Sequence, residues 1–125
     1  MALQLAAIAI GASLGAWLRW GFSFWLGPHS GAWPLGTLAA NLVGGYLVGI
    51  AVAFFALRPD LPVEWRLFAI TGFLGGLTTF STFSAEVTDL LARGDLLAGV
   101  GLASMHLFGS LLLTAAGFAT LRLIA

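Results

Sequence analysis

The chain has 125 residues, of which 60% are hydrophobic and 8% are charged, and its formal net charge is zero. A soluble domain usually carries about 25% charged residues, so the composition excludes an ordinary soluble protein and indicates an integral membrane protein. The sequence contains no cysteine, which excludes disulfides and thiolate metal sites. It also contains no basic run, so we expect no nucleic acid partner.

The first predicted helix covers residues 3–26. No basic segment precedes its apolar stretch, so we expect a retained membrane span and not a removable signal peptide. Gly11 and Gly15 have the spacing that lets a second helix approach closely. Arg19 lies in the last third of the helix, beside several aromatic residues. It is either a cation that reaches lipid headgroups from an aromatic belt or a cation at the mouth of an anion pathway.

Glycine and proline predict a loop over residues 27–34, and the second predicted helix follows over residues 35–57 without a charged residue. At about 1.5 Å per residue, this helix is long enough to cross the hydrocarbon core. Asn41 lies inside this helix, where burying its carboxamide without a hydrogen-bond partner would cost roughly several kcal/mol of free energy. The Asn41 side chain either bonds a neighbouring helix or donates a hydrogen bond to a permeating anion. Gly45 and Gly49 form a second small-residue face.

The third predicted helix, residues 64–91, follows a short charged loop and changes character near its middle. Glycine is frequent before residue 78, and serine, threonine and phenylalanine are frequent after it. Glycine loosens a helix, and hydroxyl side chains compete for its backbone hydrogen bonds. Irregular backbone at membrane depth survives only where protein covers it or where it lines a cavity. We therefore predict that this helix breaks near the bilayer centre and faces a polar pathway.

The predicted break between Gly75 and Thr79 frees backbone carbonyl groups. Such carbonyls are hard oxygen ligands that suit a hard cation such as Na⁺, and a two-fold axis through the break would double their number. Water or neighbouring side chains are the alternative partners for the same carbonyls, and the sequence leaves both interpretations open.

Phe80 and Phe83 are three residues apart, so they share one face of a helix. The edge of a phenyl ring is positive, so inward-facing edges can accept a small anion, with Asn41, Ser110 and Thr114 as additional donors. A fixed Lys or Arg at that depth would bind the anion too tightly for flux, because conduction needs weak sites in series. A dry aromatic core is the alternative interpretation of the two rings.

The fourth predicted helix covers residues 96–121. His106, Ser110 and Thr114 recur every four residues, so they lie on one face of it. Such a ladder either bonds neighbouring helices or lines a pathway.

The arginines are distributed almost evenly between the two ends of a four-helix chain. Arg58, Arg66 and Arg122 fall at the end that carries the termini, and Arg19 and Arg93 fall at the other. This bias is too weak to specify one orientation, so both orientations are expected to insert. Four helices also hardly enclose a pore alone. An antiparallel two-fold homodimer would satisfy both observations.

Enzyme chemistry is poorly supported, because no paired intramembrane carboxylate, metal-ligand spacing or convergent Ser/His/Asp set is recognisable. The first, second and fourth predicted helices contain no carboxylate, which weakens a proton-coupled transporter. Passive anion transport therefore fits better. The alternatives are a small dual-topology multidrug or cation transporter and a packing subunit of a larger membrane complex.

Residues 15–20 (GAWLRW), 36–44 (GTLAANLVG) and 71–86 (TGFLGGLTTFSTFSAE) resemble motifs of the CrcB/Fluc family of fluoride channels. The third motif is long and specific, and the resemblance covers the whole chain in length and helix order. It implies a dual-topology homodimer in the bacterial cytoplasmic membrane. Such a dimer would pass fluoride passively out of the cell, exclude chloride and contain two pores, each lined by both subunits.

The resemblance also implies roles for individual residues. It assigns Asn41, Phe80 and Phe83 to the pore, Ser81, Thr82, Ser110 and Thr114 to a polar track, and Arg19 to the vestibule. The backbone carbonyls of Gly75 and Thr78 match positions that hold a structural Na⁺ at the dimer interface. His106 lies on the same helical face as the polar track.

Overall fold

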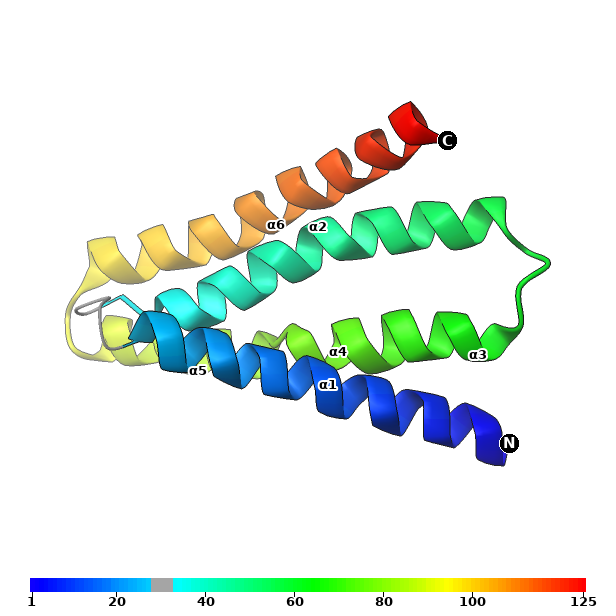
Figure 1. Cartoon of the computed structure of the whole chain (residues 1–125). Coiled ribbons are helices and arrows are strands. Elements are labelled where there is room, and N and C mark those ends of the chain that lie inside the picture. Colours follow the sequence, from blue (N-terminus) through cyan, green and yellow to red (C-terminus); the bar gives the residue numbers. More distant parts are fainter. Residues whose placement is uncertain (28–32) are drawn as a thin grey trace.

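The computed structural model describes residues 1–27 and 33–125, and these residues form an all-helical protein (Figure 1). The elements in chain order are α1 (Ala2–Leu26), α2 (Leu35–Leu57), α3 (Val63–Arg66), the π-helix η2 (Leu67–Leu74), α4 (Gly75–Leu77), α5 (Phe80–Ala92) and α6 (Leu96–Ile124). Four helical stretches are long and apolar enough to cross a membrane, with α3 to α5 forming the third. The chain is therefore a multi-pass membrane protein, as its composition predicts.

The four spans form two close pairs. α2 packs along α6, and α1 packs along η2 and α4 of the third span. Figure 1 shows both termini and the connection from α2 to α3 at one end of the bundle, and the turn from α5 to α6 at the other. The predicted loop over residues 27–34 lies mostly outside the described residues, and α6 continues past the predicted end at residue 121.

Glycine makes both pairings possible, because the backbones approach too closely for a Cβ atom. A methyl group on Gly15 would collide with the carbonyl oxygen of Phe73, and one on Gly117 would collide with that of Tyr46. The close approach predicted from Gly11 and Gly15 is confirmed: a Cβ on Gly11 would lie 2.8 Å from the backbone nitrogen of Phe73.

The third span breaks where its sequence changes character. α4 ends at Leu77, and the next two residues have extended backbone, with φ −87° and ψ 152° at Thr78 and φ −150° and ψ 122° at Thr79. Thr79 then caps α5, since its hydroxyl accepts a hydrogen bond from the backbone N–H of Thr82 at 3.2 Å. The predicted break is thus present. The eight-residue π-helix before it was not predicted.

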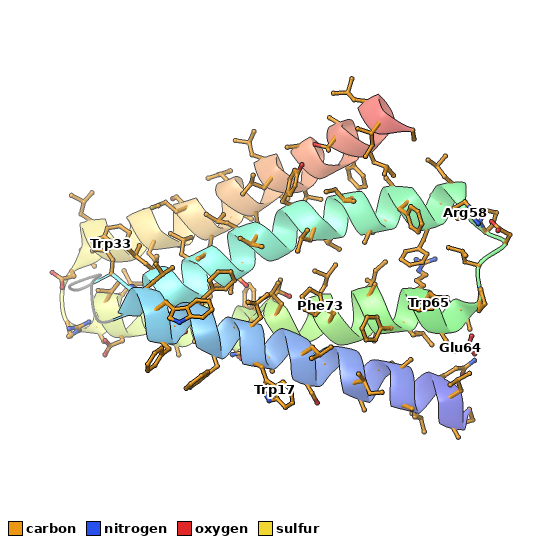
Figure 2. All side chains as sticks on the ribbon, in the orientation of Figure 1. Trp17, Trp33, Arg58, Glu64, Trp65 and Phe73 are labelled. Carbon is orange, nitrogen blue, oxygen red and sulfur yellow. The ribbon has the colours of Figure 1, made fainter. Side chains whose placement is uncertain are left out.

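The interior is small and the outside is apolar, as a lipid environment requires. Leu77 and Leu102 are fully buried, whereas Trp17 is 67% exposed and points away from the other helices (Figure 2). Charged side chains gather at the end of the bundle where α2 connects to α3; Arg58 and Glu64, for example, flank this connection (Figure 2). There the hydrogen bonds that Arg58 donates lower the pKa of the Asp60 carboxyl below its usual value.

Candidate functional site

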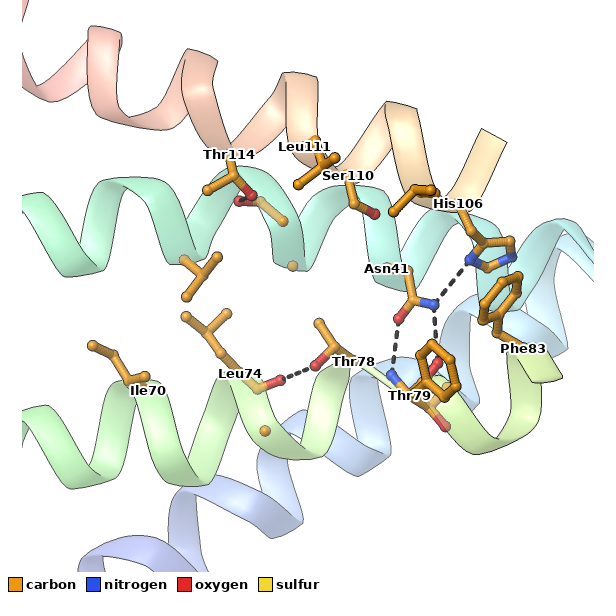
Figure 3. Close-up of a pocket in the computed structure, with 16 residues that line it drawn as sticks. Asn41, Ile70, Leu74, Thr78, Thr79, Phe83, His106, Ser110, Leu111 and Thr114 are labelled. Carbon is orange, nitrogen blue, oxygen red and sulfur yellow. Dashed lines mark hydrogen bonds between the residues drawn. The ribbon is translucent and has the colours of Figure 1, made fainter. Parts of the chain in front are cut away.

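A cavity of about 480 Å³ lies beside the break, between α2, the third span and α6 (Figure 3). Its wall combines apolar side chains, two aromatic rings, hydroxyl groups and one amide. The lining residues that the sequence predicted for the pathway, its polar face or the cation site are Asn41, Gly75, Thr78, Phe80, Phe83, His106, Ser110 and Thr114. Residues more than 70 positions apart in the sequence therefore meet at one place, and most of the predicted pathway residues share it.

Asn41 holds the break in shape. Its Oδ1 accepts a hydrogen bond from the backbone N–H of Thr79 at 2.8 Å, and its Nδ2 donates to the Thr79 carbonyl at 3.0 Å. The first bond satisfies the Thr79 N–H, which loses its helical acceptor at the break, and the second adds a donor to the carbonyl with which α5 begins. They also determine which atom of the amide is oxygen and which is nitrogen, because a backbone N–H can only donate and a carbonyl can only accept.

The same Asn41 nitrogen contacts the His106 ring. Its Nδ2 lies 3.0 Å from His106 Nδ1, as a dashed line in Figure 3 shows. His106 is 4% exposed, and its ring packs against the Phe83 ring in a tilted arrangement, with a centroid distance of 4.3 Å and an interplanar angle of 32°. Within the described residues, His106 Nε2 is buried and has no hydrogen-bond partner. An unpaired buried donor or acceptor costs about 1–3 kcal/mol, so this atom requires an explanation.

Phe80 and Phe83 pack edge to face, with centroids 5.3 Å apart and planes at 81°. This arrangement turns the positive edge of one ring toward the negative face of the other and fixes their mutual orientation. Phe80 is 78% exposed in the single chain, whereas Phe83 is partly covered by His106. An exposed ring beside a cavity is available either to lipid or to a second protein surface.

Two carbonyls at the break have lost the amide that would bond them in a continuous helix. The N–H of Thr79, the usual donor to the Gly75 carbonyl, bonds Asn41 instead. The N–H of Thr82, the usual donor to the Thr78 carbonyl, bonds the Thr79 hydroxyl. Neutral carbonyl oxygens of this kind fit a hard monovalent cation such as Na⁺. The Thr78 hydroxyl is already used, since it donates to the Leu74 carbonyl at 2.8 Å.

Arg19 reaches the break from α1. Its Nε donates to the Gly76 carbonyl at 3.1 Å, and this carbonyl would otherwise bond the N–H of Phe80 in a continuous helix. Arg19 thus satisfies a third carbonyl that the break releases, a contact that neither interpretation of the sequence included.

The predicted hydroxyl residues fall into two groups. Ser110 and Thr114 line the cavity, and Thr114 donates to the Gly45 carbonyl at 2.8 Å. Ser81 and Thr82 do not line the cavity and are exposed in the single chain. Ser81 Oγ lies 3.4 Å from Thr79 Oγ1.

Glu86 is the acidic side chain nearest to the site along α5. It approaches Thr37 of α2, and its Oε1 is buried without a hydrogen-bond partner among the described residues. Asn41 lies one helical turn after Thr37, and Glu86 lies one turn after Phe83. The acid therefore belongs to the next layer of side chains toward the turn between α5 and α6.

Sequence reasoning missed two contributions to this site. Thr79 was treated only as part of the break, although its backbone is the partner of Asn41. His106 was placed on the polar face, but its bond to Asn41 was not predicted. The sequence signal for His106 was its four-residue spacing from Ser110, which places both residues on one face of a helix.

Comparison with known proteins identifies the family. The family model described as CrcB-like protein, Camphor Resistance (CrcB), matches residues 6–118. The chain belongs to the CrcB family. A relative in Cupriavidus necator is 60% identical over 124 residues, which cover 98% of both chains. Another in Pseudomonas putida is 55% identical over 125 residues, covering 100% of this chain and 98% of the relative. Both relatives are named fluoride-specific ion channel FluC.

Proposed function

We propose that this CrcB protein is a fluoride-selective channel that lets fluoride leave the cell passively. The observation that carries the proposal is the cavity beside the break, which brings Asn41, Phe80, Phe83, Ser110 and Thr114 to one wall. The high identity to relatives named as fluoride-specific channels supports the choice of ion.

The chemistry of the wall suits a small anion in transit. The cavity-lining side chains include ring edges, hydroxyls and a histidine, and the described lining contains no Arg, Lys, Asp or Glu. Ring edges and neutral donors attract an anion weakly, and weak sites in series permit flux. Fluoride is small and strongly hydrated, so a selective path must replace its water with closely spaced donors. Chloride is larger and does not fit the same spacing.

A second copy in the opposite orientation would complete the pathway. Phe80 is 78% exposed in the single chain, and the cavity is bordered by exposed residues of α6 such as Leu107 and Leu111. An antiparallel two-fold pair would cover these surfaces with their own counterparts. Symmetry then creates two equivalent pores, one beside each break. The near-even distribution of the arginines supports insertion in both orientations.

The freed carbonyls of Gly75 and Thr78 would hold a structural Na⁺ in this dimer. Both carbonyl oxygens suit Na⁺ because they are neutral ligands and because the backbone N–H groups of Thr79 and Thr82, which would bond them in a continuous helix, bond other acceptors. When bound, the ion would supply positive charge close to the pore without a cationic side chain. The residues of this chain keep the break open for it, because Asn41 holds Thr79 and Arg19 holds Gly76.

A growth experiment tests export in the bacterial cytoplasmic membrane. A bacterium that lacks its own fluoride exporter is expected to grow on fluoride-containing medium when it expresses this chain. The Phe83→Ile variant, expressed to the same level in the membrane, is the matched control and is expected not to restore growth. Failure of the wild-type chain to restore growth, with the protein present in the membrane, would contradict fluoride export.

Tag accessibility tests the dual topology. A cysteine introduced at the C-terminus of this cysteine-free chain is expected to be labelled from both sides of the membrane by an impermeant thiol reagent. Labelling from a single side would exclude the antiparallel dimer.

A further inference from the structure

The imidazole of His106 has a defined proton arrangement that follows from its neighbours. Asn41 Nδ2 is fixed as the amide nitrogen, because Oδ1 of the same amide accepts from the Thr79 N–H. An amide nitrogen only donates, so His106 Nδ1, 3.0 Å away, must be the acceptor and carry no proton. A neutral ring then carries its proton on Nε2. His106 is therefore held in the Nε2–H tautomer.

The Asn41 amide has no remaining donor for an anion in this arrangement. One N–H bonds the Thr79 carbonyl and the other bonds His106 Nδ1. Thr114, which is also on the wall of the cavity, donates to the Gly45 carbonyl. In contrast, His106 Nε2–H is a buried donor without a partner among the described residues. His106 thus has the free donor that Asn41 lacks.

We propose that the Nε2–H group of His106 is a fluoride-binding group of this channel, and that Asn41 orients it by holding Nδ1. The inference rests on the proposed fluoride function and deepens it by naming a donor atom. Phe83 packs on the ring at 4.3 Å, so the ring plane is fixed on one face by the Phe83 ring and at its edge by Asn41. A donor held in this way loses little orientational freedom when an anion arrives.

Burial of Nε2 fits a site for a dehydrated ion. The atom is shielded from solvent in the single chain, so an anion reaches it only after losing water on that side and after a neighbouring side chain shifts. Because the ring is neutral, the interaction is a hydrogen bond and not an ion pair. The anion can therefore leave again, as conduction requires.

Solid-state NMR in lipid bilayers tests this site directly. The chain has two histidines, so the His29→Gln variant leaves His106 as the single labelled imidazole. Without fluoride, ¹⁵N spectra are expected to show a protonated Nε2 and an unprotonated Nδ1. With sodium fluoride, ¹⁹F is expected to dephase the Nε2 signal more strongly than the Nδ1 signal. Sodium chloride is expected to leave both nitrogen shifts unchanged.

Two NMR results would overturn the proposal. One is a proton on Nδ1 in the absence of fluoride. The other is an Nε2 signal that fluoride neither shifts nor dephases while the same sample conducts fluoride, which would mean that this N–H faces only water or protein. A sample that does not conduct fluoride at all would instead contradict the proposed channel function, so failure of the His106 proposal is distinguished from failure of the channel proposal.

A donor deletion supplies the functional test. Incorporation of Nε2-methylhistidine at position 106 removes the donor while it retains the ring, its stacking on Phe83 and the Nδ1 acceptor for Asn41. Loss of one hydrogen bond to an ion predicts that fluoride flux falls at least about tenfold. Flux equal to that of the unmodified protein, from a correctly folded dimer, would contradict the role of Nε2–H.

Discussion

Asn41 on α2 holds both backbone polar groups of Thr79 in the third span, accepting from its N–H at 2.8 Å and donating to its carbonyl at 3.0 Å. Its Oδ1 thus replaces the acceptor that the Thr79 N–H loses at the break, and its Nδ2 adds a second donor to the carbonyl with which α5 begins. The break is consequently a defined structure and not a loosened helix. The same amide also contacts His106 Nδ1, so Asn41 connects the break to the fourth span.

The first prediction concerns this pair. Asn41→Ala leaves the N–H of Thr79 without its partner and removes one of the donors to the Thr79 carbonyl, and the unpaired N–H alone costs about 1–3 kcal/mol. The free energy of unfolding in detergent is expected to fall by about 2 kcal/mol or more. Ser104→Ala is the control, because within residues 1–27 and 33–125 Ser104 bonds only the Val100 carbonyl of its own helix, and its loss is expected to change stability little. Equal stability of the two variants would show that Asn41 does not hold the break.

The second prediction concerns the aromatic pair. Replacing Phe80 or Phe83 with isoleucine keeps an apolar side chain but removes the ring edge, so fluoride flux in liposomes is expected to fall at least about tenfold. Phe24→Ile changes an exposed aromatic residue of α1 that does not line the cavity, and its flux is expected to stay near that of the wild type. If the Phe80 and Phe83 variants conduct like the Phe24 variant, both rings are packing residues.

The third prediction concerns the contact between α2 and α6. The added methyl group of Gly117→Ala would collide with the Tyr46 carbonyl and lie 2.9 Å from the backbone nitrogen of Ile50, so α6 must move away from α2. Overpacking of this kind costs about 1–3 kcal/mol. Among the described residues, a methyl group at Gly101 on the same helix meets only the Trp33 ring, at 3.5 Å, which is an ordinary contact, so Gly101→Ala is expected to be nearly neutral. Thermal unfolding that ranks the two variants in the opposite order would contradict the close approach.

The fourth prediction concerns sodium. If the Gly75 and Thr78 carbonyls hold Na⁺ between two copies, protein purified throughout in N-methylglucamine is expected to unfold at a lower temperature than protein purified in sodium. Returning sodium is expected to restore the higher temperature, because a ligand that binds only the folded state stabilises it. The same unfolding temperature in both solutions would exclude a stabilising sodium site.

The sequence predicts the break but not what holds it. Glycines 75 and 76 and the run of hydroxyl residues indicate where the helix weakens, since these are local properties of the chain. The bonds from Asn41 to Thr79 join residues 38 positions apart, so they depend on how α2 packs against the third span. The π-helix before the break likewise has no local sequence signal.

The composition of the pathway was also only partly predictable. The spacing of Phe80 and Phe83 places both rings on one face, and the structure brings them to the cavity with Ser110 and Thr114. Spacing alone does not tell which hydroxyls are already bonded within the chain. Thr114 is one of these, because it donates to a carbonyl of the neighbouring α2.

Fluoride efflux from liposomes that contain only this protein tests the central claim most directly. A fluoride-selective electrode outside fluoride-loaded vesicles is expected to record rapid efflux once a potassium ionophore balances the charge. No proton or sodium gradient is needed. Chloride-loaded vesicles are expected to release little chloride. Vesicles that retain their fluoride, although they contain correctly folded protein, would contradict the channel.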